Sequence, residues 1–227
     1  EEFYFQNADG KNGHIILIAE NQKGLSNIFK LQELANDNFY YKPRINMEML
    51  QKYNEGLICT TACIANQVAQ YFLKDEKILA LNHLLELGKI FEDRLYIELQ
   101  SSTVDDVIKT NKFLLETVDE INPDINIICE SWWDNDLKGA CQEYNEYCRN
   151  NFDFYNVFSV VNQIRSGRQF EDIHLDYCYK NPITFFSSNH DVSRISSMLD
   201  NDVEKVKLFL KVMIEKTRNE DNVCIYY

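Results

Sequence analysis

The sequence has few residues that break regular structure, and it has no long apolar run. Seven glycines and three prolines occur in 227 residues, which excludes collagen-like and low-complexity chains. No stretch approaches the ~18 apolar residues of a membrane-spanning helix, and Glu1-Glu2 does not resemble the start of a signal peptide. We therefore expect a globular, cytoplasmic protein without a membrane partner, and the missing initiator Met suggests a fragment or a processed chain.

Paired cysteines and positive charge are also scarce. The seven cysteines are an odd set without a Cys-x-x-Cys pair, which favours a reduced intracellular protein over a disulfide framework. Acidic residues outnumber basic ones by 36 to 23, and the net charge is −13. Such a field repels phosphate backbones, so we do not expect nucleic acid as a partner of the isolated chain. Neutral sugars are compatible with this charge.

What the sequence does contain is an alternation of apolar runs with helical patterns. Val203, Val206 and Leu210 recur at helical spacing and predict the clearest helix. We predict strands near 2–5, 14–19, 56–60, 95–99, 125–129, 152–158, 183–187 and 223–227, and helices near 24–36, 46–52, 64–73, 76–91, 104–121, 136–149 and 202–218. The first two strands flank turn residues and predict a hairpin. The remaining alternation is typical of a mainly parallel α/β sheet covered by helices.

The first half contains motifs that resemble one known family. The motifs are Glu2-Phe-Tyr4, His14-Ile-Ile-Leu-Ile-Ala-Glu-Asn21, Tyr40-Tyr-Lys-Pro-Arg-Ile45, Gly56-Leu-Ile58, Cys63-Ile-Ala65 and Arg94-Leu-Tyr-Ile-Glu-Leu-Gln100. They resemble the phosphoesterase-type (PHP) domain of the bacterial DNA polymerase III alpha subunit. In that family, clustered His, Asp and Glu residues hold metal ions that activate water against a phosphate ester. Among them, Glu2 and His14 match two metal ligands, and two ligands make a weak site, so we expect no metal ion or other cofactor. The alternative for His14 is a strand-edge histidine without metal.

The second half resembles a different family. Ile125-Asn-Ile-Ile-Cys-Glu-Ser-Trp132, Phe152-Asp-Phe154, Asn189-His-Asp191 and Cys224-Ile-Tyr-Tyr227 resemble the later half of an alpha-amylase-type glycoside hydrolase barrel. The resemblance implies that Glu130 is the general acid/base and that Asp191 stabilises the transition state. It also implies that substrate is bound by His190, Asn189 and Trp132. A carboxyl after an apolar strand and beside tryptophans has a raised pKa, which suits proton donation.

The hydrolase motif set has a gap at the nucleophile. The family nucleophile is an Asp at the end of the fourth strand, and here that strand reads Arg94-Leu-Tyr-Ile-Glu98. Glu98 is the one carboxylate near the vacant place, although solvent exposure or a salt bridge is its ordinary role. Glu130 is equally open to interpretation as an ordinary strand-end carboxylate. Without a nucleophile, we expect sugar cleavage to be absent or far below that of a complete enzyme.

The sequence therefore predicts one TIM-like (βα) barrel over residues 1–227, assembled from two half-barrels of different ancestry. The PHP-like half spans 1–111 and the alpha-amylase-like half spans 112–227. The leading functional interpretation is a weak or inactive glycoside hydrolase half-site that binds an oligosaccharide. The alternatives are a remnant of a polymerase PHP-type phosphoesterase or replication module, and an engineered or fused chimera without activity. Open barrel seams would permit a homo-oligomer.

Overall fold

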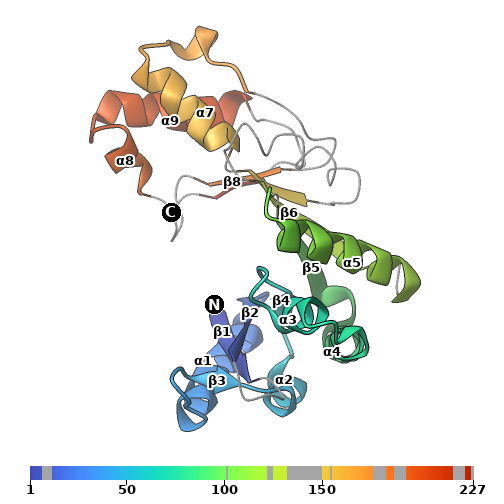
Figure 1. Ribbon diagram of the computed structural model, residues 1–227. Coiled ribbons are helices and arrows are strands. Elements are labelled where there is room, and N and C mark those ends of the chain that lie inside the picture. The colour runs from blue at the N-terminus through green and yellow to red at the C-terminus, as the bar shows by residue number, and fades with distance from the viewer. Residues whose placement is uncertain are drawn as a thin grey trace. The chain divides into compact units, whose positions relative to one another are not determined.

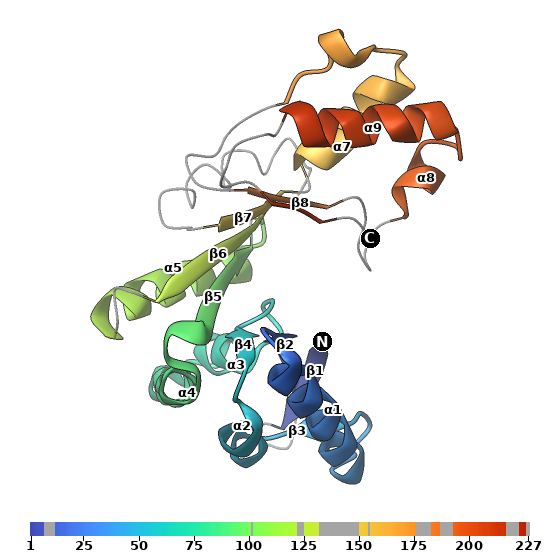
Figure 2. The same ribbon diagram turned by 180° about the vertical axis from the view of Figure 1, so that it is seen from behind.

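The computed structural model describes residues 1–6, 12–100, 102–121, 125–131, 150–153, 155–175, 183–186, 193–216 and 223–225. The chain divides into two compact units, which are traced in Figures 1 and 2. The first unit comprises Glu1–Leu99 and Val104–Ile127, and the second comprises Gln100–Thr103 and Ile128–Tyr227.

The first unit contains a mixed sheet with the strand order β3-β1-β2-β4-β5. Its strands are β1 (Glu2–Gln6), β2 (Asn12–Ala19), β3 (Arg44–Ile45), β4 (Leu57–Thr60) and β5 (Leu95–Gln100). β2 pairs antiparallel with both β1 and β4, whereas β1–β3 and β4–β5 are parallel. The antiparallel β1–β2 pair confirms the predicted hairpin. β6 follows β5 in the strand order, and its first residues, Asn126 and Ile127, belong to this unit.

The strands of the first unit bury alternate side chains, as a pleated strand against a core must. Phe3 and Phe5 of β1 and Ile15 and Leu17 of β2 are buried. In β5 the buried set is Leu95, Ile97 and Leu99. The intervening residues are partly exposed, so Glu2, His14 and Glu98 have access to the surface.

Three helices of the first unit begin after an asparagine. α1 (Gln22–Asp37), α2 (Met47–Tyr53) and α3 (Gln67–Leu73) are preceded by Asn21, Asn46 and Asn66, whose side chains accept hydrogen bonds from backbone N–H groups of the first turn. These bonds satisfy donors that have no partner inside the helix. The unit also contains α4 (Lys77–Phe91), η1 (Glu92–Arg94) and α5 (Asp105–Ile121).

The second unit contains a parallel sheet with the order β6-β7-β8-β9. The strands are β6 (Asn126–Ser131), β7 (Asn150–Asp153), β8 (Ile183–Phe186) and β9 (Val223–Ile225), and the helices are α7 (Tyr155–Arg165), η3 (Phe170–Asp172), α8 (Ile195–Met198) and α9 (Val203–Lys216). α7 and α9 pack together, as both views show. Their shared core includes Val160, Ile164, Phe209 and Val212.

The predicted strand over 152–158 is wrong at its carboxyl end. The structure has β7 at Asn150–Asp153 and then the helix α7 from Tyr155. Val157, Val160, Val161 and Ile164 are all buried, and their spacing of three, four and seven residues places them on one helical face. Valines are common in strands, but here the helical period determines the structure.

The predicted α/β class, with mostly parallel strands and interleaved helices, is confirmed. Two finer points stay predictions. One is that two half-barrels close into a barrel, and the other is that residues 1–111 and 112–227 are the halves of a single domain. The predicted helix at 136–149 lies outside the described residues. No helix among the described residues is long and apolar enough to cross a membrane.

Candidate functional site

Glu2 and His14, the two residues matched to metal ligands, lie together in the first unit. Their side chains come from adjacent antiparallel strands, because Tyr4 pairs with His14 and Glu2 pairs with Ile16. Glu2 Oε1 is 2.8 Å from His14 Nδ1. The ring of Tyr4 contacts the imidazole edge-on, with 5.1 Å between centroids. The proximity of these two side chains follows from strand register, since both point to the same face of the hairpin.

Cys63 adds a thiol to this pair. Its Sγ lies 3.9 Å from His14 Nδ1, in the loop after β4, where the preceding Ala62 has a left-handed φ of 58°. Burial raises the pKa of the Cys63 thiol; a hydrogen bond with the backbone of Ala65 opposes this, and the carboxylates of Glu98 and Glu2 add to it. Cys63 and the buried Cys59 are free thiols, whereas Cys129 is disulfide-bonded, which differs from the fully reduced set expected from spacing.

Glu98 is held by the same loop. Its carboxylate accepts a hydrogen bond from Thr60 Oγ1 at 3.0 Å, and its backbone N–H donates to Thr61 Oγ1 at 3.0 Å. Thr60 Oγ1 in turn accepts from the backbone N–H of Ala62 at 3.1 Å. Glu98 is the carboxylate nearest to the place of the missing nucleophile, and in the structure it fixes the loop that contains Cys63.

The geometry excludes a relay of the Cys–His–acid type through His14. In such a relay the nucleophile and the orienting carboxylate use opposite nitrogens of the imidazole. Here the thiol and the Glu2 carboxylate both approach Nδ1. A thiol with a raised pKa is also a poor nucleophile, because the thiolate is the reactive form. Cys63 therefore lacks the arrangement of a catalytic cysteine.

The residues present do not fit a resident metal ion. Among the described residues, no group of three or more His, Cys, Asp or Glu side chains is placed to hold a metal. Glu2 and His14 already pair with each other. Cys63 would have to lose its proton to bind a metal, and its neighbours oppose that loss. No metal-dependent step is therefore assigned to the Glu2–His14 site.

The sequence motifs predict no role for Cys63. The signal was present in the motif Cys63-Ile-Ala65, which the resemblance included, but the register that brings the loop after β4 beside β2 is a tertiary feature. β2 and β4 pair through Ile16 and Thr60, and an isolated bridge joins His14 to Asn66. These contacts are what place Cys63 next to His14.

The hydrolase-like residues are described only at Glu130. This residue lies in β6 and is half-buried, and its Oε2 accepts a hydrogen bond of 2.6 Å from Gln100 Nε2. The other predicted residues, Trp132, Asn189, His190 and Asp191, lie outside the described residues. β6 and β8 belong to one parallel sheet, as predicted, but the placement of Asp191 relative to Glu130 stays a prediction.

Comparisons with known proteins concern mainly the first half. The PHP domain family matches residues 1–102. DNA polymerase III subunit alpha from Aquifex aeolicus (strain VF5) is 43% identical over 109 residues, which is 48% of this chain and 9% of that protein. The same subunit from Borreliella burgdorferi is 34% identical over 131 residues, or 57% of this chain and 11% of that protein. The chain thus spans a small part of the length of these relatives.

A solved structure, the alpha-amylase from H. orenii, has a TM-score of 0.46 and 17% identity, and the match covers 67% of this chain and 33% of that chain. A likeness of this size supports no functional argument. The leading interpretation as a glycoside hydrolase half-site of carbohydrate metabolism is therefore wrong, because the sequence relatives point to the polymerase subunit. That interpretation depended on short strand-end motifs around Glu130 and Asp191, and fold ancestry does not confer function.

Three observations support the same family resemblance for the first half of the chain. They are the strand register, the Glu2–His14 pair and the sequence matches. The Glu2–His14 pair lies in the first unit, and the family match covers residues 1–102. Residues 1–102 match the PHP domain family and resemble DNA polymerase III subunit alpha.

Proposed function

We propose that the first unit is a PHP-type module of phosphoesterase ancestry, of the kind present in DNA polymerase III subunit alpha. The supporting observation is the match of residues 1–102 to this family, together with the Glu2–His14 pair at the motif positions. We further propose that the unit acts as a replication-type module and is not a self-sufficient phosphoesterase.

Electrostatics support a non-catalytic role. The site presents two carboxylates, Glu2 and Glu98, around a protonated thiol. A phosphate ester is an anion, and without a metal ion these carboxylates repel it. His14 is the one side chain of the cluster able to become cationic, and its Nδ1 is occupied by Glu2. The cluster thus lacks a cation that would neutralise charge on a phosphate during hydrolysis.

The test is hydrolysis of p-nitrophenyl phosphate by the full chain with Mn²⁺ or Zn²⁺. We expect no turnover above that of the protein-free solution, and no difference between the parent chain, His14→Asn and Glu2→Gln. Glu33→Gln, which alters an exposed carboxylate on α1, is the matched control. Metal-dependent turnover that is lost in both site variants but kept in the control would show a working phosphoesterase and overturn the proposal.

Metal content gives a second test of the same proposal. After dialysis, elemental analysis should find far less than one zinc or manganese ion per chain, because two paired donors and a protonated thiol form a weak site. One tightly held ion per chain, removed by His14→Asn, would contradict the fit described above. The roles predicted for Glu130 and Asp191, and oligosaccharide and homo-oligomer partners, stay predictions.

A further inference from the structure

The second unit contains a basic groove that neither the motifs nor the family match includes. It lies between the segment that follows α7 and one face of α9, and its volume is about 440 Å³. Pockets that bind small molecules occupy about 300–1,000 Å³. The polar side chains that line it are Arg168, Gln169, Glu204, Lys205, Lys207 and Lys211. We call this site the α7–α9 groove.

The charge of the groove differs in sign from that of the chain. Four cationic side chains and one carboxylate line it, whereas the whole chain has a net charge of −13. A groove with a local excess of positive charge attracts anions and concentrates them near the surface. The groove is thus electrostatically suited to an anionic ligand.

Two of the four cations are already paired with carboxylates. Lys207 Nζ is 2.8 Å from Glu204 Oε1, and Lys205 Nζ is 3.7 Å from Asp200 and 3.9 Å from Asp202. Exposed pairs of this kind contribute about 0–1 kcal/mol each. They leave Arg168 and Lys211 as the cations on which an anion would depend most.

Arg168 and Lys211 have neutral partners among the described residues. Arg168 Nη1 donates to Gln163 Oε1 at 2.8 Å and to the Asp172 carbonyl at 3.5 Å. Lys211 Nζ lies 4.3 Å from the centroid of the Phe170 ring. Neutral acceptors and an aromatic face leave the positive charge of both groups uncompensated, so both can bind an anion without first breaking an ion pair.

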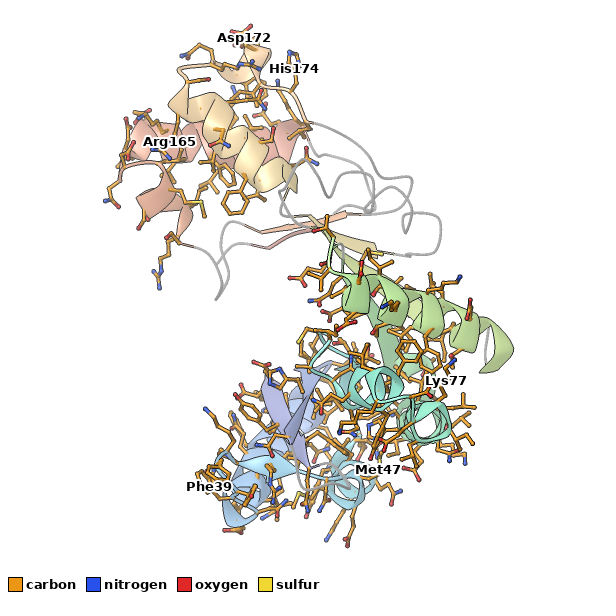
Figure 3. All side chains as sticks on the ribbon, in the orientation of Figure 1. Phe39, Met47, Lys77, Arg165, Asp172 and His174 are labelled. Atoms are coloured by element: carbon orange, nitrogen blue, oxygen red, sulfur yellow. The ribbon has the colours of Figure 1, made fainter. Side chains whose placement is uncertain are left out.

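The backbone around Arg168 is fixed by the end of α7. Arg168 N–H donates to the Gln163 carbonyl at 3.1 Å, and Gly167 N–H donates to Ile164 O at 3.0 Å. Gly167 has a φ of 89°, a conformation that glycine adopts without strain. In Figure 3, Arg165 marks the end of α7 and Asp172 marks the segment that follows. This fixed backbone and the bond from Arg168 Nη1 to Gln163 Oε1 orient the guanidinium before any ligand arrives, which lowers the entropic cost of binding.

We propose that the α7–α9 groove binds a small anion that bears phosphate groups. The planar guanidinium of Arg168 can donate two hydrogen bonds to phosphate oxygens, and the Lys211 ammonium supplies a second, point-like charge. A diphosphate has the charge to engage both. A nucleic acid is disfavoured, because its long backbone would meet the acidic remainder of the chain.

The test is titration of the full chain with pyrophosphate at low ionic strength, followed by amide chemical shifts and by calorimetry. We expect saturable binding, with shift changes concentrated in residues 163–172 and 203–211. Arg168→Gln and Lys211→Gln should each weaken binding by about tenfold, as expected for the loss of a charge-assisted hydrogen bond. Lys109→Gln, an exposed position on α5, is the matched control and should leave the affinity unchanged.

Three results would overturn the proposal. The first is a response to pyrophosphate that does not saturate or that chloride reproduces at equal ionic strength. The second is equal affinity in the two groove variants and the control. The third is tighter binding of a single-stranded oligonucleotide than of pyrophosphate, which would assign the groove to nucleic acid. Far-ultraviolet circular dichroism of each variant checks that the fold is retained.

Discussion

In the first unit the polar groups at the end of the sheet are bonded to one another, whereas in the second unit the two free cations of the α7–α9 groove have neutral partners. Glu2 pairs with His14, and Glu98 bonds to the loop through Thr60 and Thr61. Arg168 is bonded to the Gln163 side-chain amide and the Asp172 carbonyl. Residue types that are common in active sites can therefore have a purely structural role, as Glu2, His14 and Glu98 do. A turn without any motif, such as the one that contains Arg168, can leave a positive charge available for a ligand.

The largest change in stability is expected from a substitution in the core of the second unit. Phe209→Ala removes a buried ring from the α7–α9 core and should cost about 3–5 kcal/mol of stability. Urea-dependent amide exchange of α9 measures the loss within the second unit. Ile214→Ala, on the same helix but 53% exposed, should change stability by under about 1 kcal/mol. Similar losses in both variants would mean that α9 does not pack through Phe209.

A pH dependence should follow from a largely buried imidazole in the first unit. Burial lowers the pKa of His83 to about 4 from its ordinary value of 6.5; its ring contacts Phe5 and Tyr71 edge-on. The unfolded chain takes up a proton below pH 6.5 and the folded chain does not. Stability is thus full above about pH 6.5 and should fall by up to ~3 kcal/mol as the pH drops to 4.

The variant His83→Phe should remove this slope between pH 6.5 and 4, as measured by urea unfolding of β2 amides at several pH values. His174→Gln, an exposed histidine, is the control and should keep it. An unchanged slope in His83→Phe would show that other groups set the acid sensitivity of the first unit.

Close backbone contact distinguishes two glycines of the first unit. A Cβ at Gly24 would lie 1.8 Å from the Gly56 carbonyl oxygen, whereas nothing lies within 4 Å of a Cβ at Gly88. Gly24→Ala should therefore destabilise the unit by about 1–3 kcal/mol. Gly88→Ala, inside α4, should stabilise it by about 0.5–1 kcal/mol through helix propensity. The melting temperature should therefore fall in Gly24→Ala and rise in Gly88→Ala. Changes of the same sign in both variants would contradict the close contact between Gly24 of α1 and Gly56, the residue before β4.

A smaller effect concerns two glutamines of α3. Gln67 is buried, and the nitrogen and oxygen of its amide have no hydrogen-bond partner in the part of the chain that the structure describes. Gln70 Nε2, in contrast, donates to Ala65 O at 2.7 Å and to Asn12 O at 3.3 Å. Gln67→Leu should raise stability by about 1 kcal/mol, because it removes an unsatisfied buried polar group. Gln70→Leu should lower it by a similar amount. A loss of stability in Gln67→Leu, measured by urea unfolding, would indicate that the amide has a bonding partner in solution.

Local patterns predicted much of the fold. The helix expected near 202–218 occurs as α9 at Val203–Lys216, because its apolar period is unambiguous. The run at 152–158 was misassigned, since a short valine-rich segment is compatible with strand or helix until its packing partners are known. Burial of Val160 and Ile164 against Phe209 decides the case.

The site was less accessible to sequence reasoning than the fold. The hairpin predicted from the first two strands brings Glu2 and His14 onto one face, because strand register fixes which residues share a face. The approach of Cys63 to His14 depends on the antiparallel pairing of β2 with β4, whereas strand–helix alternation favours parallel pairs. No sequence motif marks the groove around Arg168. The groove is formed by the turn that contains Arg168 and by α9, and Arg168 is 36 residues before Glu204 of that helix.

The three asparagine caps of the first unit differ in which substitutions they can accept. Asn21 and Asn46 use their side-chain oxygen to accept from the following helix, and an aspartate would keep that role and add a charge favourable to the helix dipole. Asn66 also donates through Nδ2 to the Cys63 carbonyl at 2.7 Å. An aspartate there would lose the donor and face a carbonyl oxygen with a negative charge. Aspartate should therefore be tolerated at positions 21 and 46. Position 66 requires asparagine, because its Nδ2 holds the loop that places the Cys63 thiol beside His14.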